Sequence, residues 1–326
     1  MAGSSVAGAR RKLLLVASTG GHLAQLVRLA PGLGASDDSL WVTFRSPQSE
    51  SLLAGKRVLY VPYVRPRDFA GVLNTYRTVS ALLKRERFAQ AVSTGAAIAL
   101  AALPAARRHG VPTLYIESIS RVQGPSLSGR VLAATRFAEL RTQHPSWAGG
   151  RWGTHPAVLA TYRRREVSRT AERPRLFVTL GTIEGYRFDA MIDAVLATGL
   201  ADERTVWQLG FSAGRTDLPG QVYEQVSAAE FERYAREADV VVTHAGVGTI
   251  LGLLEMGVHP VAVVRRSARN EHVDDHQAQI AALIGELRVG SGVEVDDLDA
   301  DTIRAAARYR IDIDGTSEAA RVSAGN

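Results

Sequence analysis

Short runs of apolar residues alternate with amphipathic stretches along most of the chain, and this pattern predicts strands and helices in turn. Mostly apolar runs are typical of strands buried on both faces, and in the first half they predict strands at 12–17, 40–44, 58–61, 91–93 and 113–116. Apolar residues at helical spacing predict helices that begin near residue 22 and that span 76–85, 97–108 and 131–136. Strands and helices in this order predict a parallel, doubly wound sheet.

A second series of predicted strands and helices follows a change in composition between residues 147 and 175. Glycines, prolines and the polar run 163–173 separate the halves, so we place a linker near 160–174 and domains at 1–160 and 161–326. The second series predicts strands at 176–180, 205–208, 240–243 and 260–264, and helices at 188–197, 229–237 and 274–283. The expected fold class is α/β, with two Rossmann-like doubly wound parallel-sheet domains facing across a cleft.

The most informative stretch is 240–264, which reads as a strand, a glycine turn, a helix and a parallel strand. The turn contains His244, Gly246 and Gly248, and it opens the helix where backbone N–H groups and the helix dipole favour a phosphate. The hydroxyl of Thr249 suits either a phosphate oxygen or a simple N-cap. Glu255 lies about two turns and ~10 Å further along the same helix face, where it could accept hydrogen bonds from ribose hydroxyls. A phosphate seat with a ribose clamp predicts a nucleotide-sugar site.

Two strand ends of the first half carry candidate catalytic side chains. Gly20, Gly21 and His22 follow the first strand and open the first helix, so the backbone can approach a substrate closely. His22 is either a base for an acceptor hydroxyl or a histidine that caps the helix or binds a diphosphate. Glu117, after the strand at 113–116, is either an acid, base or acceptor ligand, or the partner of Arg121 in an ion pair.

Further candidates flank the main turn of the second half. Gly181 and Thr182 repeat the strand–glycine pattern and suit a phosphate or the lining of the domain gap. His276 and Gln277 begin a helix after a charged loop, and a glutamine there could bind sugar hydroxyls. The turn at 93–97 is best explained by close packing of a helix on the sheet.

Charge and composition narrow the function classes. The 39 basic and 33 acidic residues give a net charge of +6, with the excess mostly arginine, which prefers phosphates and anionic headgroups. An arginine-rich surface from a GC-rich genome explains the same excess. Aromatic residues make up 6% and do not interleave with basic ones, so nucleic acid is not an expected partner.

The sequence argues against metals and redox cofactors. It has no cysteine, no D-x-D pair at a sheet edge and no histidines at ligand spacing, although 274–276 is one acidic cluster with a histidine. The glycine pair at 20–21 lacks the G-x-G-x-x-G spacing of nicotinamide-dinucleotide sites. We therefore expect no cofactor and no metal.

No stretch has the character of a membrane span. Residues 88–106 are uncharged, but Gly95 and Pro104 interrupt them, so a buried strand and helix explain them better. The apolar run after the first basic cluster is too short for a signal peptide. We expect a cytoplasmic protein that at most rests on a membrane surface.

These motifs resemble a known family of glycosyltransferases. Residues 243–249, 255–257 and 275–277 resemble the catalytic subunit of the two-part N-acetylglucosaminyltransferase that extends dolichol-diphosphate GlcNAc, and 177–182 resemble its opening strand and loop. Residues 18–22, 93–95, 117–118 and 121–130 resemble the membrane-recruiting partner of that subunit. Both signatures in one chain are similar to fused bacterial exopolysaccharide glycosyltransferases and, more distantly, to the lipid II-forming transferase.

The resemblance implies a GT-B fold with the donor in the C-terminal domain and the acceptor in the N-terminal one. It implies UDP phosphates on Gly246, Gly248 and Thr249, with Glu255 on the ribose. It also implies the donor sugar on His276 and Gln277, and Gly20, Gly21 and His22 lining the catalytic gap. Such enzymes invert the anomeric carbon without an essential metal. The eukaryotic partner has an N-terminal membrane helix that this chain lacks, so we expect any membrane contact to come from a surface such as the loop 65–69.

The sequence therefore predicts an inverting, metal-independent transferase that moves a hexose or N-acetylhexosamine from a UDP-sugar to a polyprenyl-diphosphate-linked saccharide in cell-surface polysaccharide assembly. A UDP-sugar 2-epimerase, a transferase acting on a soluble metabolite, and a non-catalytic partner that binds a nucleotide sugar are the alternatives. The sequence leaves open the donor sugar and base, the acceptor and the oligomeric state.

Overall fold

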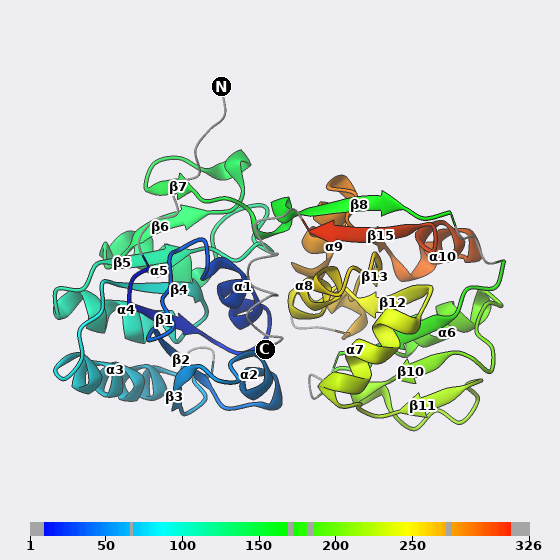
Figure 1. Cartoon of the computed structure of the whole chain (residues 1–326), viewed down its shortest axis with the longest axis horizontal. Coiled ribbons are helices and arrows are strands. Elements are labelled where there is room, and N and C mark those ends of the chain that lie inside the picture. The colour runs from blue at the N-terminus through cyan, green and yellow to red at the C-terminus, as the bar shows by residue number, and fades with distance from the viewer. Residues whose placement is uncertain (1–9, 66–67, 169–171, 182–184, 272–275, 314–326) are drawn as a thin grey trace. The chain divides into compact units, whose positions relative to one another are not determined.

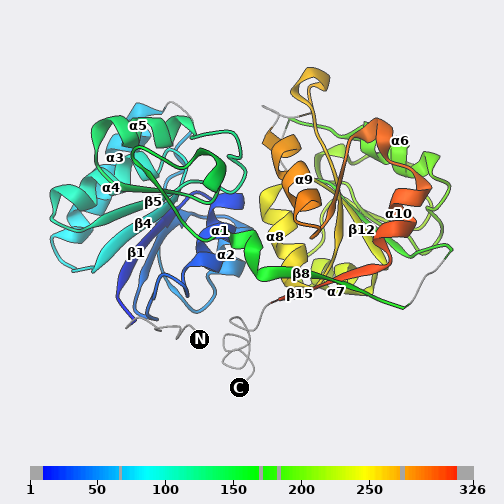
Figure 2. The same ribbon diagram turned by 90° about the horizontal axis from the view of Figure 1, so that it is seen from above.

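A computed structural model of the chain describes residues 10–65, 68–168, 172–181, 185–271 and 276–313. The chain forms two compact units, Met1–Val158 and Leu159–Asn326. Each unit has its own parallel sheet with helices on both faces (Figures 1 and 2). The expected α/β fold with two doubly wound parallel sheets is confirmed.

The sheet of the first unit has seven strands in the order β3-β2-β1-β4-β5-β6-β7, and all neighbouring pairs are parallel. Its strands are β1 (Leu13–Ala17), β2 (Leu40–Phe44), β3 (Arg57–Val61), β4 (Gln90–Gly95), β5 (Thr113–Ile116), β6 (Glu139–Thr142) and β7 (Trp152–Thr154). Its helices are α1 (Gly21–Leu29), α2 (Pro47–Leu52), α3 (Phe69–Leu83), α4 (Ala99–Arg108) and α5 (Leu127–Thr135), with a 3-10 turn at Pro145–Trp147.

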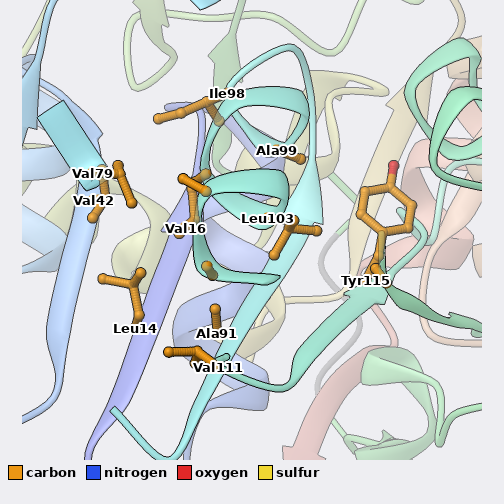
Figure 3. Close-up of a cluster of buried hydrophobic side chains, with 14 of the residues drawn as sticks. Leu14, Val16, Val42, Val79, Ala91, Ile98, Ala99, Leu103, Val111 and Tyr115 are labelled. Atoms are coloured by element: carbon orange, nitrogen blue, oxygen red, sulfur yellow. The ribbon is translucent and has the colours of Figure 1, made fainter. Parts of the chain in front are cut away.

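The central strands of this sheet are apolar on both faces because helices cover both. All five residues of β1 are buried. Leu14 and Val16 belong to the core under α3, α4 and α5, which Figure 3 shows around Leu103, while Leu13 and Leu15 face the α1 side. The uncharged stretch 88–106 forms β4 and most of α4, with Pro104 inside the helix, as the sequence predicted.

The second unit repeats this architecture with six strands in the order β11-β10-β9-β12-β13-β14, again all parallel. Its strands are β9 (Leu176–Thr179), β10 (Val206–Gln208), β11 (Gln221–Tyr223), β12 (Val240–His244), β13 (Pro260–Val263) and β14 (Ser291–Val293). Its helices are α6 (Asp189–Ala197), α7 (Ala228–Glu237), α8 (Val247–Glu255), α9 (His276–Glu286) and α10 (Ala300–Ala306). Short 3-10 turns lie at Val158–Thr161, Gly210–Ser212, Ser267–Arg269 and Val295–Asp297.

Part of the segment expected to be a linker is a strand. Within 160–174, β8 (Tyr162–Glu166) pairs antiparallel with β15 (Tyr309–Ile313), close to the end of the chain in sequence. The polar residues at 163–166 are exposed, and the Arg164 guanidinium lies 4.1 Å from the centre of the Tyr309 ring. The sequence does not predict this strand, because its residues are charged and its pairing partner lies more than 140 residues away.

Both sheets reverse their strand order at one point, between β1 and β4 in the first unit and between β9 and β12 in the second. At such a point the connections run to opposite faces of the sheet, and the loops at the carboxyl ends of the two strands diverge and leave room for a ligand. The loops after these four strands are therefore the places to look for a functional site. Within the described residues, no helix is long and apolar enough to cross a membrane.

Candidate functional site

The loop after β1 leads directly into α1 through a glycine in the left-handed region. Gly20 has φ 85° and is the N-cap of α1, which has no side-chain cap. The N–H of Gly20 donates to Oε1 of Gln48 at 2.5 Å, and Nε2 of Gln48 donates back to the Gly20 carbonyl at 3.4 Å. An oxyanion bound at the Gly20 N–H would have to displace Gln48. At the next residue, the Gly21 carbonyl accepts a hydrogen bond from Nε2 of Gln25 at 3.0 Å.

His22 lies in the first turn of α1, which follows β1, and its side chain contacts the end of the adjacent strand β4. Its Nδ1 lies 2.8 Å from the Thr94 carbonyl, and Oγ1 of Thr94 donates to the His22 carbonyl at 2.7 Å. A carbonyl only accepts, so Nδ1 carries the proton and Nε2 of the neutral ring keeps its lone pair. Burial lowers the pKa of His22, against the opposing effect of the Thr94 carbonyl. The ring is thus held neutral and ready to accept a proton.

The turn after β4 makes room for this histidine. Gly95 has φ 128°, and a Cβ at this position would lie 2.8 Å from Cε1 of His22. The packing role expected for the turn at 93–97 therefore includes holding the His22 ring.

Glu117 is fully buried at the end of β5 and makes four hydrogen bonds within its own surroundings. Oε1 accepts from the Tyr115 hydroxyl and the Ser118 N–H at 3.1 Å each, and Oε2 accepts from the Ser126 N–H at 2.9 Å and the Ser126 hydroxyl at 3.0 Å. Ser126 in turn caps α5 through the N–H of Gly129. This arrangement fastens the segment between β5 and α5, and it occupies the carboxylate oxygens that a proton acceptor would use.

Two buried glutamines that the sequence analysis did not single out also hold the segment after β5. Oε1 of Gln25 accepts from the Ile119 N–H at 2.8 Å and from Nε2 of Gln143 at 3.1 Å. Nε2 of Gln143 also donates to the Glu117 carbonyl at 3.0 Å, and Nε2 of Gln25 donates to Oγ of Ser118. Gln25 and Gln143 are 118 residues apart, so only the folded sheet reveals the network.

In the second unit, the ends of β9 and β12 bring three predicted residues together. His244 ends β12, and Gly246 is the N-cap of α8, which has no side-chain cap. A Cβ on Gly246 would collide with Nε2 of His244, and a Cβ on Gly181 would lie 3.1 Å from the same nitrogen. The two glycines therefore leave space around the His244 ring beside the open first turn of α8, where Gly248 and Thr249 lie.

Glu255, the last residue of α8, has a partner that the sequence did not predict. The buried Tyr162 at the start of β8 donates its hydroxyl to Oε1 of Glu255 at 2.6 Å. This bond fixes the carboxylate from one side and gives Glu255 a structural contact within its own unit.

The remaining predicted residues are only partly described. Thr182, the acidic pair at 274–275 and the side chain of His276, at the start of α9, lie outside the described part of the structure. Gln277 is buried, and within the described part of the chain its Oε1 has no hydrogen-bond donor. A carboxamide oxygen in this state is suited to a ligand hydroxyl.

Comparison with known proteins extends these observations. Residues 194–301, which include β12, α8 and the start of α9, match the model of the glycosyltransferase family 28 C-terminal domain. Over 310 residues, 86% of this chain and 83% of the relative, the chain is 27% identical to the UDP-N-acetylglucosamine–N-acetylmuramyl-(pentapeptide) pyrophosphoryl-undecaprenol N-acetylglucosamine transferase of Parasynechococcus marenigrum. The chain is a glycosyltransferase.

A second relative matches about a third of the transferase chain. UDP-N-acetylglucosamine transferase subunit ALG13 of Yarrowia lipolytica is 32% identical over 125 residues, which cover 32% of the transferase and 57% of that subunit.

Solved structures show the fold of the transferase. Acinetobacter baumannii MurG superposes with a TM-score of 0.54 at 16% identity, covering 90% of the transferase and 89% of that chain. The calicheamicin glycosyltransferase CalG4 gives 0.52 at 17% identity, covering 91% and 89%. The fold of the transferase is GT-B, as the resemblance implied. Within the described residues, it has no group of three or more His, Asp or Glu side chains placed to hold a metal ion.

Proposed function

We propose that the protein is an inverting, metal-independent transferase that moves a hexose or N-acetylhexosamine from a UDP-sugar to a polyprenyl-diphosphate-linked saccharide. The observation that carries the donor assignment is the uncapped start of α8 at the strand-order reversal of the second unit, opened by Gly246 and bordered by Gly181. A helix N-terminus at this place suits a diphosphate. The relatives described above are named as UDP-N-acetylglucosamine transferases, which supports a UDP-sugar as the donor.

In the proposed donor site, α8 and its flanking turns hold the nucleotide sugar. The amides near Gly246 and Gly248 and the Thr249 hydroxyl bind the diphosphate. Glu255 binds the ribose. Gln277, whose carboxamide oxygen has no donor among the described residues, binds the sugar together with His276.

In the proposed reaction, an acceptor hydroxyl attacks the anomeric carbon on the face opposite the diphosphate. The bond from this carbon to the acceptor oxygen forms while its bond to the diphosphate breaks, and the electron pair of the breaking bond leaves with UDP. Nε2 of His22 accepts the proton of the acceptor hydroxyl, since the bond from Nδ1 to Thr94 leaves that nitrogen as the basic one. Glu117, with both oxygens engaged, positions the segment after β5.

We further propose that the protein works at the inner face of the plasma membrane, held by an apolar surface of the first unit. Phe69 and Leu73 lie one turn apart on α3 and are 85% and 48% exposed, and the exposed Arg77 follows one turn later. Leu127 on α5 is 68% exposed. Apolar side chains beside an arginine suit shallow insertion among anionic headgroups, where a lipid-linked acceptor of cell-surface polysaccharide assembly would be found.

Vesicle sedimentation tests the membrane proposal. The variant with Phe69→Ser and Leu73→Ser should sediment with anionic phospholipid vesicles several-fold less than wild type. Phe211→Ser with Val222→Ser is the matched control, because it removes two exposed apolar side chains from the second unit. Equal sedimentation of all three proteins would contradict this surface.

The activity itself is tested by screening nucleotide sugars for thermal stabilisation and then assaying transfer to a polyprenyl-diphosphate saccharide. The expected result is a product of inverted configuration, formed in the presence of a chelator. A UDP-sugar 2-epimerase is the second candidate, because the structure of a putative UDP-N-acetylglucosamine 2-epimerase from Listeria monocytogenes shares the fold, with a TM-score of 0.51 at 14% identity. The S. aureus MnaA structure with UDP also shares it, with 0.54 at 13%. Incubation with UDP-GlcNAc alone, followed by NMR, would reveal an epimer if this candidate were correct.

A further inference from the structure

One arginine of the second unit is buried without a hydrogen-bond partner for its guanidinium among the described residues. Arg265 lies two residues beyond β13, and its side chain is completely buried. Among the residues that the structure describes, no acceptor lies within hydrogen-bond distance of Nε, Nη1 or Nη2. A guanidinium has five N–H donors, and burying them unpaired together with a positive charge costs several kcal/mol, on the order of the stability of a small domain.

The neighbours of Arg265 shield it without satisfying its donors. The guanidinium carbon lies 5.0 Å from the centre of the Phe188 ring, a cation–π contact that uses no N–H. Glu271 is close enough to act on it electrostatically, but its Oε2 accepts from the Arg266 N–H at 2.9 Å and from Nε of Arg269 at 3.0 Å. Burial lowers the pKa of Arg265 to about 10, so the side chain is still charged at neutral pH.

The position of the guanidinium points to a ligand. The adjacent strands β9, β12 and β13 end side by side, and they deliver Gly181, His244 and Arg265 to one edge of the sheet. A Cβ on Gly181 would lie 3.1 Å from Nη1 of Arg265 and 3.1 Å from Nε2 of His244, so both nitrogens border the small space that this glycine leaves. The uncapped start of α8 follows His244 by three residues.

We propose that Arg265 binds the diphosphate of the sugar donor through its guanidinium nitrogens, which have no hydrogen-bond partner among the described residues. This inference rests on the proposed function and assigns a residue that its donor site did not include. The planar fork of an arginine matches two phosphate oxygens, and charge-assisted hydrogen bonds of this kind are among the strongest that proteins make. When the bond between the anomeric carbon and the diphosphate breaks, its electron pair adds negative charge to the departing phosphate, and Arg265 stabilises this charge.

Calorimetric titration with UDP, UMP and uridine tests the proposal. Arg265→Gln should weaken UDP binding about 10- to 100-fold, UMP less and uridine not at all, because uridine has no phosphate. Arg266→Gln is the matched control, since Arg266 is the next residue and its guanidinium pairs with Glu294 at 2.6 Å. It should bind all three ligands as wild type does. Equal UDP affinity in Arg265→Gln and wild type would overturn the inference and leave the proposed function intact.

Inorganic pyrophosphate separates the failure of the inference from that of the proposed function. If wild type binds no nucleotide, the proposed donor assignment fails. Pyrophosphate binding that disappears in Arg265→Gln would still support an anion site at Arg265. Pyrophosphate affinity that does not depend on Arg265 would contradict it.

Thermal unfolding distinguishes a ligand from a structural residue. Arg265→Met removes the buried charge at similar length, so the ligand-free variant should melt no lower than wild type, while stabilisation by UDP is lost. A lower melting temperature with full stabilisation by UDP would indicate a structural residue. If both neutral variants fail to fold, Arg265→Lys keeps the charge without the fork. Unchanged UDP and pyrophosphate affinity in the folded Lys variant would refute the proposal.

Discussion

The chemistry of His22 depends on a single hydrogen bond to a neighbouring strand. The Thr94 carbonyl fixes the proton on Nδ1, so the free Nε2 is the nitrogen that can act as a base. The imidazole is thereby oriented by the backbone of β4. This favours His22 over Glu117 as the proton acceptor, since the oxygens of Glu117 are already used by Tyr115, Ser118 and Ser126.

We expect His22→Ala to lower kcat by roughly 10²- to 10⁴-fold, the usual contribution of a general base. The dissociation constant for UDP should stay unchanged, because the proposed donor site lies in the other unit. His109→Ala, at the opposite end of the β4–α4 segment, serves as the control and should keep full activity. A large loss of UDP affinity in His22→Ala would instead point to a diphosphate ligand.

The pH dependence of turnover should report the same histidine. Burial lowers the pKa of His22 below its ordinary value of 6.5, so the basic form predominates at pH 7. We expect kcat/KM to be flat near neutrality and to fall as pH drops through the lowered pKa. A pH profile of wild type and His22→Ala checks this, because the acid limb should disappear in the variant. An acid limb with its midpoint above 6.5 would contradict the assignment.

At the scale of elements, the turn between β12 and α8 requires small residues for reasons of space. Gly246 has φ −82°, which any residue adopts, but a Cβ there would collide with the His244 ring. Gly246→Ala should therefore displace His244 and weaken UDP binding at least several-fold. Gly285→Ala on α9 meets no atom within 4 Å and is the control, which should bind UDP normally. Equal UDP affinity in calorimetry of the two variants would argue against a ligand at this turn.

The contact between β8 and α8 separates two roles of Glu255. If Glu255 binds the ribose and Tyr162 only orients it, Glu255→Gln should weaken UDP binding about tenfold or more, and Tyr162→Phe only a few-fold. Calorimetry and thermal unfolding of both variants check this. A common loss of stability with unchanged UDP affinity would mean that the pair is purely structural.

The elements that the sequence predicted are those whose pattern is local. Central strands such as β2 and β5 were predicted to the residue, because every residue in them is buried and all but one in each is apolar. Among the three-residue strands, β10 is fully buried and was predicted, whereas β7, β11 and β14 are partly exposed and carry too little pattern. Strand β8 was missed because it is charged.

At the site, too, the sequence predicts only features that depend on neighbouring residues. The turns at Gly20 and Gly246 are readable because a glycine between a strand and a helix is a local signal. The network of Gln25 and Gln143, the partner of Glu255 and the burial of Arg265 all depend on residues far apart in sequence, so no window along the chain reveals them. The sequence analysis did not single out Arg265, whose side chain is fully buried.

At the scale of the whole molecule, the two units share one strand order, with the third, second and first strands of each sheet followed by the fourth, fifth and sixth. The repetition of the strand–turn–helix pattern in the sequence anticipates this duplication. The same construction thus provides one candidate site in each unit, a histidine base in the first and an anion seat in the second.

Global stability should fall in mild acid because of a histidine far from these turns. Burial, with the charges of Arg164 and Arg310, lowers the pKa of His259 from 6.5 to about 4. The unfolded chain therefore binds a proton below pH 6.5 that the folded chain rejects, and stability declines as pH falls from 6.5 to 4, by as much as about 3 kcal/mol. Denaturant unfolding at several pH values should show this slope reduced in His259→Asn. An identical slope in the variant would show that other groups are responsible.

The pairing of β8 with β15 has a consequence for how the protein is made. Strand β8 has no partner until β15 has been synthesised, so this two-stranded sheet forms only after all six strands of the larger sheet of the second unit have been made. During this interval the strand would be an exposed edge, open to mispairing with other chains. The arginines at 163–165 are exposed, and their like charges disfavour pairing of this strand with a copy of itself.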